Sequence, residues 1–197
     1  MDYNEATTLF RTEDTQKQLY ALNNAFKIHE TTQSQPTDEF LTEIIERGLS
    51  CEKSQLVREL SFQYINLLYK HSIIRWSEVR AAVITEMGTA ETASCLCAAI
   101  KILHRLPISD LISFCGSKDG ISVMKSCLLS PLVEICAISI ENFGPILLDA
   151  WLYVQSTNAI DGYINVESTS EARRFRDDIS DFVLDTMKNF ANGLIGK

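Results

Sequence analysis

Proline, glycine and positive charge are all scarce in this sequence. Only 4 of the 197 residues are proline and 8 are glycine, and most fall where one periodic segment ends and another begins. Hydrophobic residues make up 46% and charged residues 22%, which excludes a disordered chain. Lysine and arginine number 18 against 26 aspartates and glutamates, a formal net charge of −8. Because phosphate binding requires clustered cations, this balance argues against nucleic acid and anionic membranes and favours a basic protein partner.

Long apolar runs and targeting signals are also missing. No apolar stretch reaches the length of about 18 residues that a transmembrane helix requires. The first ten residues, MDYNEATTLF, lack the basic start and apolar core of a secretory signal. The six cysteines lie mostly inside apolar helical runs, a pattern that suits a reducing compartment. We therefore expect the protein in the cytoplasm, the nucleus or both.

Signatures of catalysis and of metal binding are absent as well. No Cys-x-x-Cys pair exists, and Cys95 and Cys97 would point in nearly opposite directions on a helix, which is wrong for a shared zinc ion. Residues 117–120 lack the spacing of a phosphate-binding loop and predict a turn. The three histidines are spread over separate helices or their ends: His29, His71 and His104. We expect these histidines in the core or at its rim, and predict no enzyme activity, cofactor or metal.

Helical periodicity fills the chain from end to end. The central segment, residues 89–116, has only four charged side chains, and residues 93–106 predict a helix buried on most of its circumference. Apolar spacing and capping residues predict helices over residues 5–10, 13–29, 37–48, 51–70, 77–88, 93–106, 108–115, 121–129, 132–143, 145–154 and 171–192. No alternation typical of strands competes with them. The predicted class is all-α.

Several boundaries and core positions are specific enough to test. Thr37 is expected to cap one helix, which Gly48 should end in a left-handed turn, and Ser50 should open the next. The clearest amphipathic stripe is expected to be buried: Leu56, Leu60, Tyr64, Leu67 and Leu68. The predicted core positions are Leu60, Leu96, Ile100 and Phe182.

Helix starts near Thr12, Ser50 and Thr89 recur at intervals of 38–39 residues. This spacing is close to the period of HEAT-type helix pairs and favours a HEAT/ARM-like α-solenoid of about five antiparallel pairs. We expect a single helical repeat domain over residues 1–197, and the ending NGLIGK, typical of a cut within a loop, favours a fragment of a longer solenoid. An irregular helical bundle is the alternative interpretation.

The last predicted helix carries the most informative polar segment. Arginine and aspartate four residues apart support a solvated helix face, and an acidic band follows them. That band is either plain solvated surface or a ridge that binds a basic protein segment. The candidate protein-binding residues are Arg173, Arg174, Arg176, Asp177, Asp178, Asp181 and Asp185.

Within that helix, residues 175–182, FRDDISDF, resemble the FRxDxSD-type segment in HEAT repeats of the importin-β (karyopherin) superfamily. The resemblance implies a non-enzymatic scaffold that binds another protein, in nuclear transport or in assembly of a larger complex. It carries over no functional residues. The alternatives are an all-α lipid-head-group or membrane-trafficking adaptor module, and an all-α enzyme without a recognisable motif. A lipid module would require a lysine cluster at a helix tip, whereas Lys and Arg are dispersed here.

Overall fold

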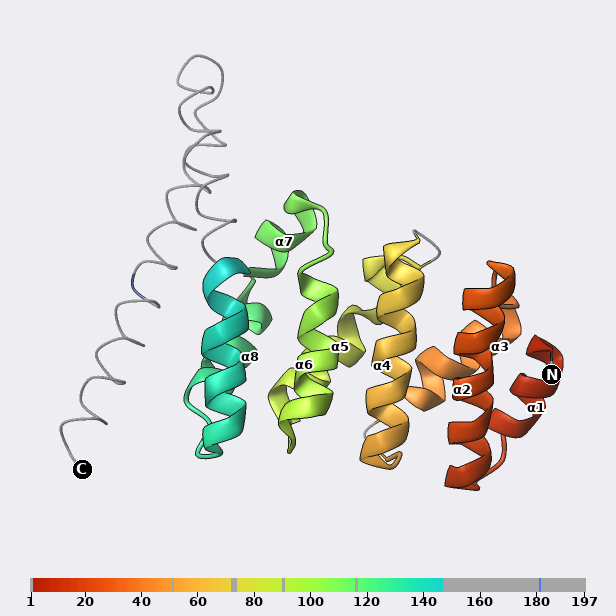
Figure 1. Ribbon diagram of the computed structural model, residues 1–197. Helices are drawn as coiled ribbons and strands as arrows, with labels where there is room; N and C mark the ends of the chain where they lie inside the picture. Colours follow the sequence, from red (N-terminus) through yellow and green to blue (C-terminus); the bar gives the residue numbers. More distant parts are fainter. Residues whose placement is uncertain are drawn as a thin grey trace, which may run out of the picture. The chain divides into compact units, whose positions relative to one another are not determined.

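The computed structural model describes residues 2–50, 52–71, 74–89, 91–115 and 117–146, and Asp181. In these ranges every regular element is a helix, as Figure 1 shows, which confirms the predicted all-α class. None of the helices in the described ranges is both long and apolar enough to cross a membrane. The chain divides into two compact units, Met1–Arg105 and Leu106–Lys197.

Three helices stand side by side in the first unit. They are α2 (Thr15–Thr32), α4 (Gln55–Lys70) and α6 (Ala93–Leu103), with α4 packed against both of the others (Figure 1). Their starts lie 40 and 38 residues apart, close to the predicted interval. Gln55 Nε2 donates to Thr92 Oγ1 at the starts of α4 and α6, and Arg105 Nε, just past the end of α6, donates to Asn66 Oδ1 near the end of α4. The two helices therefore run in the same direction.

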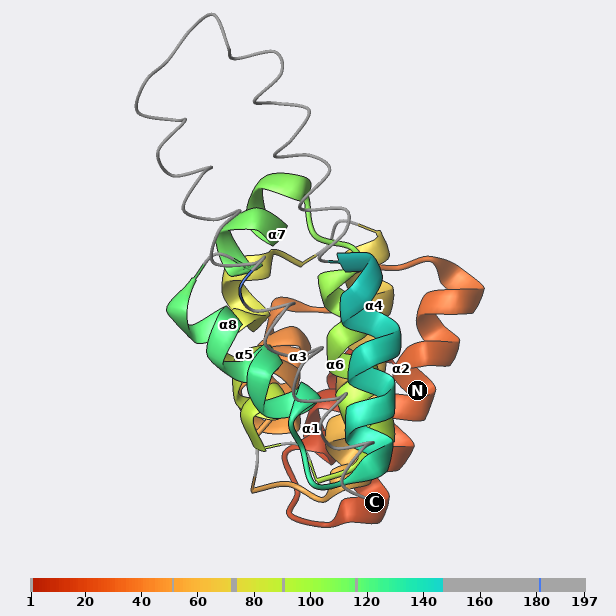
Figure 2. The ribbon, with the colours of Figure 1, turned by 90° about the vertical axis from the view of Figure 1, so that its left-hand side faces the viewer.

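The other helices form a second row in this unit. They are α1 (Tyr3–Phe10), α3 (Asp38–Glu43), the π-helical turn η1 (Ile44–Gly48) and α5 (Trp76–Thr89). Helix α1 packs on α2 and α3, η1 packs on α4 and α5, and α5 packs on α6. Figure 2 shows α1, α3 and α5 on one side of the row formed by α2, α4 and α6. Apolar side chains between the two rows make the core, among them Phe10, Phe40, Ile44, Phe62 and Leu96.

Side-chain caps set where several of these helices begin. Thr37 accepts a hydrogen bond from the backbone N–H of Phe40, which confirms the predicted cap of α3. The prediction that Ser50 opens the next helix was wrong, because Ser54 accepts from Val57 N and α4 begins only at Gln55. A capped start satisfies N–H groups that have no partner within the helix. Either serine suits that role, so the sequence alone did not decide between them.

Gly48 does not form the predicted left-handed turn. In the described part of the chain no glycine has a positive φ, and the helix ends through η1, with Leu49 N bonded to Ile44 O at 3.1 Å. A Cβ at position 48 would lie 2.5 Å from Ser61 Oγ and 3.0 Å from Phe10 Cζ. Glycine is therefore required here by close helix packing.

The predicted buried stripe of α4 was only partly right. Tyr64 and Leu68 are fully buried, but Leu56 is 52% exposed, and Leu60 and Leu67 are half-buried. The buried face is turned toward other positions, which include Val57, Phe62 and Ile65. Helix α4 packs on α2, α6 and η1, so its faces toward these three elements are buried. The edge that carries Leu56, Leu60 and Leu67 faces outward.

The other predicted core positions had mixed outcomes. Leu96 and Ile100 are fully buried, as predicted. The prediction for Leu60 was wrong, because this side chain is only half-buried on α4. Phe182 lies outside the described residues.

The second unit has three helices among its described residues. They are α7 (Ile108–Cys115), α8 (Lys118–Leu128), which packs on α7, and a helix over residues 133–146. Residues 117–120 are the start of α8 and not a separate turn, since Ser117 Oγ accepts from Gly120 N at 3.0 Å. The last helix continues through Gly144 and Pro145, where the sequence predicted an interruption. The predicted loop at 156–169 and most of the two last predicted helices lie outside the described residues.

Candidate functional site

Of the seven candidate residues in the last predicted helix, the structure describes one. Asp181 is helical and exposed, as a solvated face or a binding ridge would both require. Arg173, Arg174, Arg176, Asp177, Asp178 and Asp185 lie outside the described residues. The acidic ridge therefore stays a prediction.

An apolar surface that the sequence did not identify runs along the outer side of α2 and α4. We call it the α2–α4 strip, and its members are Phe26, Leu56, Leu60 and Leu67. Leu56 is 52% exposed, and the other three are half-buried. The three leucines are four and seven residues apart, so they share one edge of α4.

Ring contacts show that this leucine edge lies next to α2. The rings of Phe26 and Tyr64 are 5.1 Å apart in a T-shaped arrangement. Leu60 and Leu67 precede and follow Tyr64 by one helical turn on the adjoining edge of α4, and Phe26 of α2 packs against this same Tyr64. Apolar side chains of both helices therefore share one surface. The spacing of the leucines indicated that they share one edge of α4. The sequence did not show that the neighbouring helices leave this edge exposed to solvent.

The junction of α4, α5 and α6 holds a buried ion pair. Arg58 Nε lies 3.2 Å from Glu86 Oε2, with side chains 10% and 4% exposed, and Arg58 Nη1 donates to Lys53 O at 3.0 Å. The buried thiol of Cys95 lies beside this pair. Burial first, and the Glu86 charge second, raise the pKa of Cys95 to about 12.

Other buried thiols are in the same state. Burial raises the pKa of Cys115 to about 12 and that of Cys127 to about 11. Because the thiolate is the nucleophile, a thiol that stays protonated at neutral pH is a poor catalyst. Cys97, the other half of the sequence pair with Cys95, is half-buried. In the described ranges no group of three or more His, Cys, Asp or Glu side chains could hold a metal ion.

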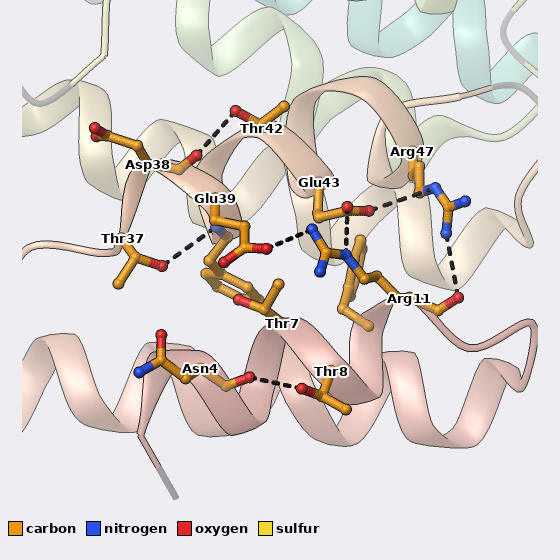
Figure 3. A network of polar contacts seen from close by, with 12 residues as sticks. Asn4, Thr7, Thr8, Arg11, Thr37, Asp38, Glu39, Thr42, Glu43 and Arg47 are labelled. Atoms are coloured by element: carbon orange, nitrogen blue, oxygen red, sulfur yellow. Dashed lines mark hydrogen bonds and ion pairs between the residues drawn. The ribbon is translucent and has the colours of Figure 1, made fainter.

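An exposed polar network ties the end of α1 to α3 and η1. Arg11 contacts Glu39 and Glu43 at 2.7 Å each, and Arg47 reaches both Glu43 Oε2 and the Arg11 carbonyl (Figure 3). Arg11 donates hydrogen bonds to Glu43 and Glu39, which raises the pKa of Arg11 and keeps it charged. Exposed ion pairs contribute little to stability, and these four side chains neutralise one another. The network therefore fastens neighbouring helices and offers no unpaired charge to a ligand.

Two histidines that are 42 positions apart in the sequence come together. The ring centroids of His29 and His71 are 5.1 Å apart, with an angle of 61° between the rings. His104, the third histidine, is the exposed C-terminal cap of α6. The separation of 42 positions is close to the helix-pair interval, and residues one interval apart lie level on neighbouring helices. That spacing was the signal that could have predicted the pair.

Comparison with known proteins gives no relative from which a function could be taken. No protein-family description, no curated protein and no solved structure matches the chain. The resemblance of residues 175–182 to importin-β HEAT repeats stays a prediction. The function is therefore inferred from the packing and surface of the chain's own helices.

Proposed function

We propose that the chain is a non-enzymatic, HEAT-like helical scaffold that binds another protein. The row of α2, α4 and α6, with starts 40 and 38 residues apart and a second helix beside each, supports this proposal. In stacked helix pairs each pair packs on its neighbours, and the row leaves a long continuous surface for a partner. The resemblance to importin-β repeats favours transport or assembly of a larger complex as the setting.

The α2–α4 strip is the observation that carries the proposal. Leucine side chains spaced at one and two helical turns, with the Phe26 ring beside them, are the kind of anchors that an amphipathic partner helix packs against. The opposite flank of α4 is different, because the hydrogen bonds from Gln55 to Thr92 and from Arg105 to Asn66 occupy its polar groups. An apolar face on one side of α4 and a polar seam on the other favour docking between α2 and α4.

The net charge of the chain favours a basic partner. The whole chain carries a formal net charge of −8. Long-range attraction of this kind speeds association and weakens as salt screens it. The polar groups described above support a binding role over catalysis, since they pair with one another in a buried ion pair and an exposed network.

Site-specific photo-crosslinking tests the proposal. A photoreactive phenylalanine at Leu60 should crosslink to a defined protein in native lysate, and the same residue at Thr8, exposed on α1, should not. Leu56→Glu, one helical turn away, should abolish the Leu60 crosslink. Leu129→Glu is the matched control, because Leu129 is 55% exposed and the loss of apolar surface is similar. A crosslink that survives Leu56→Glu, or that is equally strong from Thr8, would refute the strip as the binding surface.

A further inference from the structure

The two neighbouring histidines stand at the C-terminal ends of two parallel helices. His29 lies in the last turn of α2, and His71 is the C-terminal cap of α4. His29 is buried, whereas His71 is exposed, so the pair is reached from solvent on the His71 side. Helix C-termini carry partial negative charge, and a cation between two of them is stabilised by both.

The backbone after α2 fixes the protonation of His29. Gln33 has a φ of 52°, uncommon for a residue other than glycine, and the turn brings the Ser34 carbonyl to 3.2 Å from His29 Nδ1. A carbonyl oxygen only accepts, so Nδ1 carries the proton of this hydrogen bond. The neutral ring then keeps its lone pair on Nε2.

Two tyrosines hold that carbonyl in place. Tyr3 Oη donates to the Ser34 carbonyl at 3.3 Å, and Tyr64 Oη donates to Tyr3 Oη at 3.2 Å. Burial raises the pKa of Tyr64, so this hydroxyl remains a donor. Histidines that bind metals usually donate their second ring N–H to a carbonyl or carboxylate, which fixes the ring's orientation. His29 has this arrangement before any metal is bound.

The distance between the rings fits a shared metal ion. Two imidazoles that bind one tetrahedral zinc ion through nitrogens at about 2.0–2.1 Å have ring centroids roughly 5 Å apart. The centroids of His29 and His71 are 5.1 Å apart. Imidazole is a preferred ligand of zinc, and also of copper and nickel.

We propose that His29 and His71 bind one Zn²⁺ ion that fastens the end of α2 to the end of α4. The described part of the chain adds no third side chain of a metal-binding type at this place. The ion therefore keeps coordination positions for water or for a donor from a bound protein. This inference does not depend on the proposed binding surface, and it departs from the expectation that the chain binds no metal.

Zinc titration of the full-length protein and three glutamine variants tests the site. Calorimetry in a reducing buffer without chelators should show one Zn²⁺ per wild-type chain, and Tm should rise with zinc concentration. His104→Gln is the matched control and should behave as the wild type. His71→Gln should lose both the binding and the rise in Tm, and so should His29→Gln.

The exposed position of His71 keeps the test decisive if His29→Gln fails to fold. Imidazole nitrogen NMR of the wild type should then show His29 protonated at Nδ1, and zinc should shift the signals of His29 and His71 but not those of His104. Wild-type protein without a stoichiometric zinc ion would overturn the site. Zinc binding that persists in His71→Gln would also overturn it, because thiols or other groups would then be the ligands.

Discussion

Gly48 lies where η1 meets Phe10 of α1 and Ser61 of α4. A Cβ there would come within 2.5 Å of Ser61 Oγ, on the buried face of α4. The glycine therefore sets the spacing between η1 and α4. A methyl side chain at this position would push the two rows apart. The sequence analysis predicted a turn at Gly48, because glycine often ends a helix. The sequence does not show that Ser61 and Phe10 lie against this residue.

Gly48→Ala should therefore destabilise the first unit by about 1–3 kcal/mol, the usual cost of overpacking. Urea unfolding followed by circular dichroism measures the loss. Adding Ser61→Ala removes the Oγ and should recover part of it, because residues in contact couple. Gly144→Ala is the control. Nothing lies within 4 Å of a Cβ at that position, so helix propensity should leave stability unchanged or raise it. Equal losses in both alanine variants would contradict the packing argument.

The buried thiols make the free energy of unfolding depend on pH in the alkaline range. Folding raises the pKa of Cys115 from 9.0 to about 12, so the folded state holds its proton more tightly than the unfolded state. The stabilisation is complete below about pH 9 and is lost as pH rises toward 12. In Cys115→Ala the free energy of unfolding should fall less steeply between pH 9 and 11 than in the wild type. Cys97→Ala, at a half-buried position, is the control, and equal slopes in wild type and Cys115→Ala would contradict the prediction.

At the scale of elements, the sequence predicted the helices well and their orientation less well. Apolar spacing and caps predict the all-α class and, within a few residues, most described helices. The outward turn of the Leu56, Leu60 and Leu67 edge could not be predicted, because it depends on α2 and α6 flanking α4. The start of α4 was missed because Ser50 and Ser54 are both good caps. The histidine pair and the α2–α4 strip were missed for the same reason, since each needs two helices in register.

Alanine substitutions along these helices test the orientation directly. Ile100→Ala on α6 removes a fully buried side chain and should lower the free energy of unfolding by about 2–5 kcal/mol. Leu56→Ala on α4 should cost about 0.5 kcal/mol or less, because surface substitutions rarely cost more. Thermal and urea unfolding of both variants give the comparison. A large loss in Leu56→Ala would place the leucine edge in the core, as the sequence had predicted.

At the scale of the whole molecule, the chain divides between Arg105 and Leu106. In the first unit, α1, α3, η1 and α5 cover one side of α2, α4 and α6. Each of these elements contributes buried side chains to the core between the two rows. The sequence indicated a single repeating array and gave no sign of a division there, because Pro107 resembled an ordinary break between helices. A unit with its own core should fold without the rest of the chain.

Residues 1–105 alone should therefore be helical and unfold cooperatively. The reason is that α6 supplies the last buried face, including Cys95, Leu96 and Ile100, that α4 and α5 pack against. Residues 1–88 are the control, because removing α6 exposes that face of α4 and leaves the Arg58–Glu86 pair open to water. Far-ultraviolet circular dichroism with urea unfolding should show a sharp transition for 1–105 and a broad one for 1–88. If both fragments unfold alike, α6 is not the closing element of the first unit, and the division between the units does not mark an independent fold.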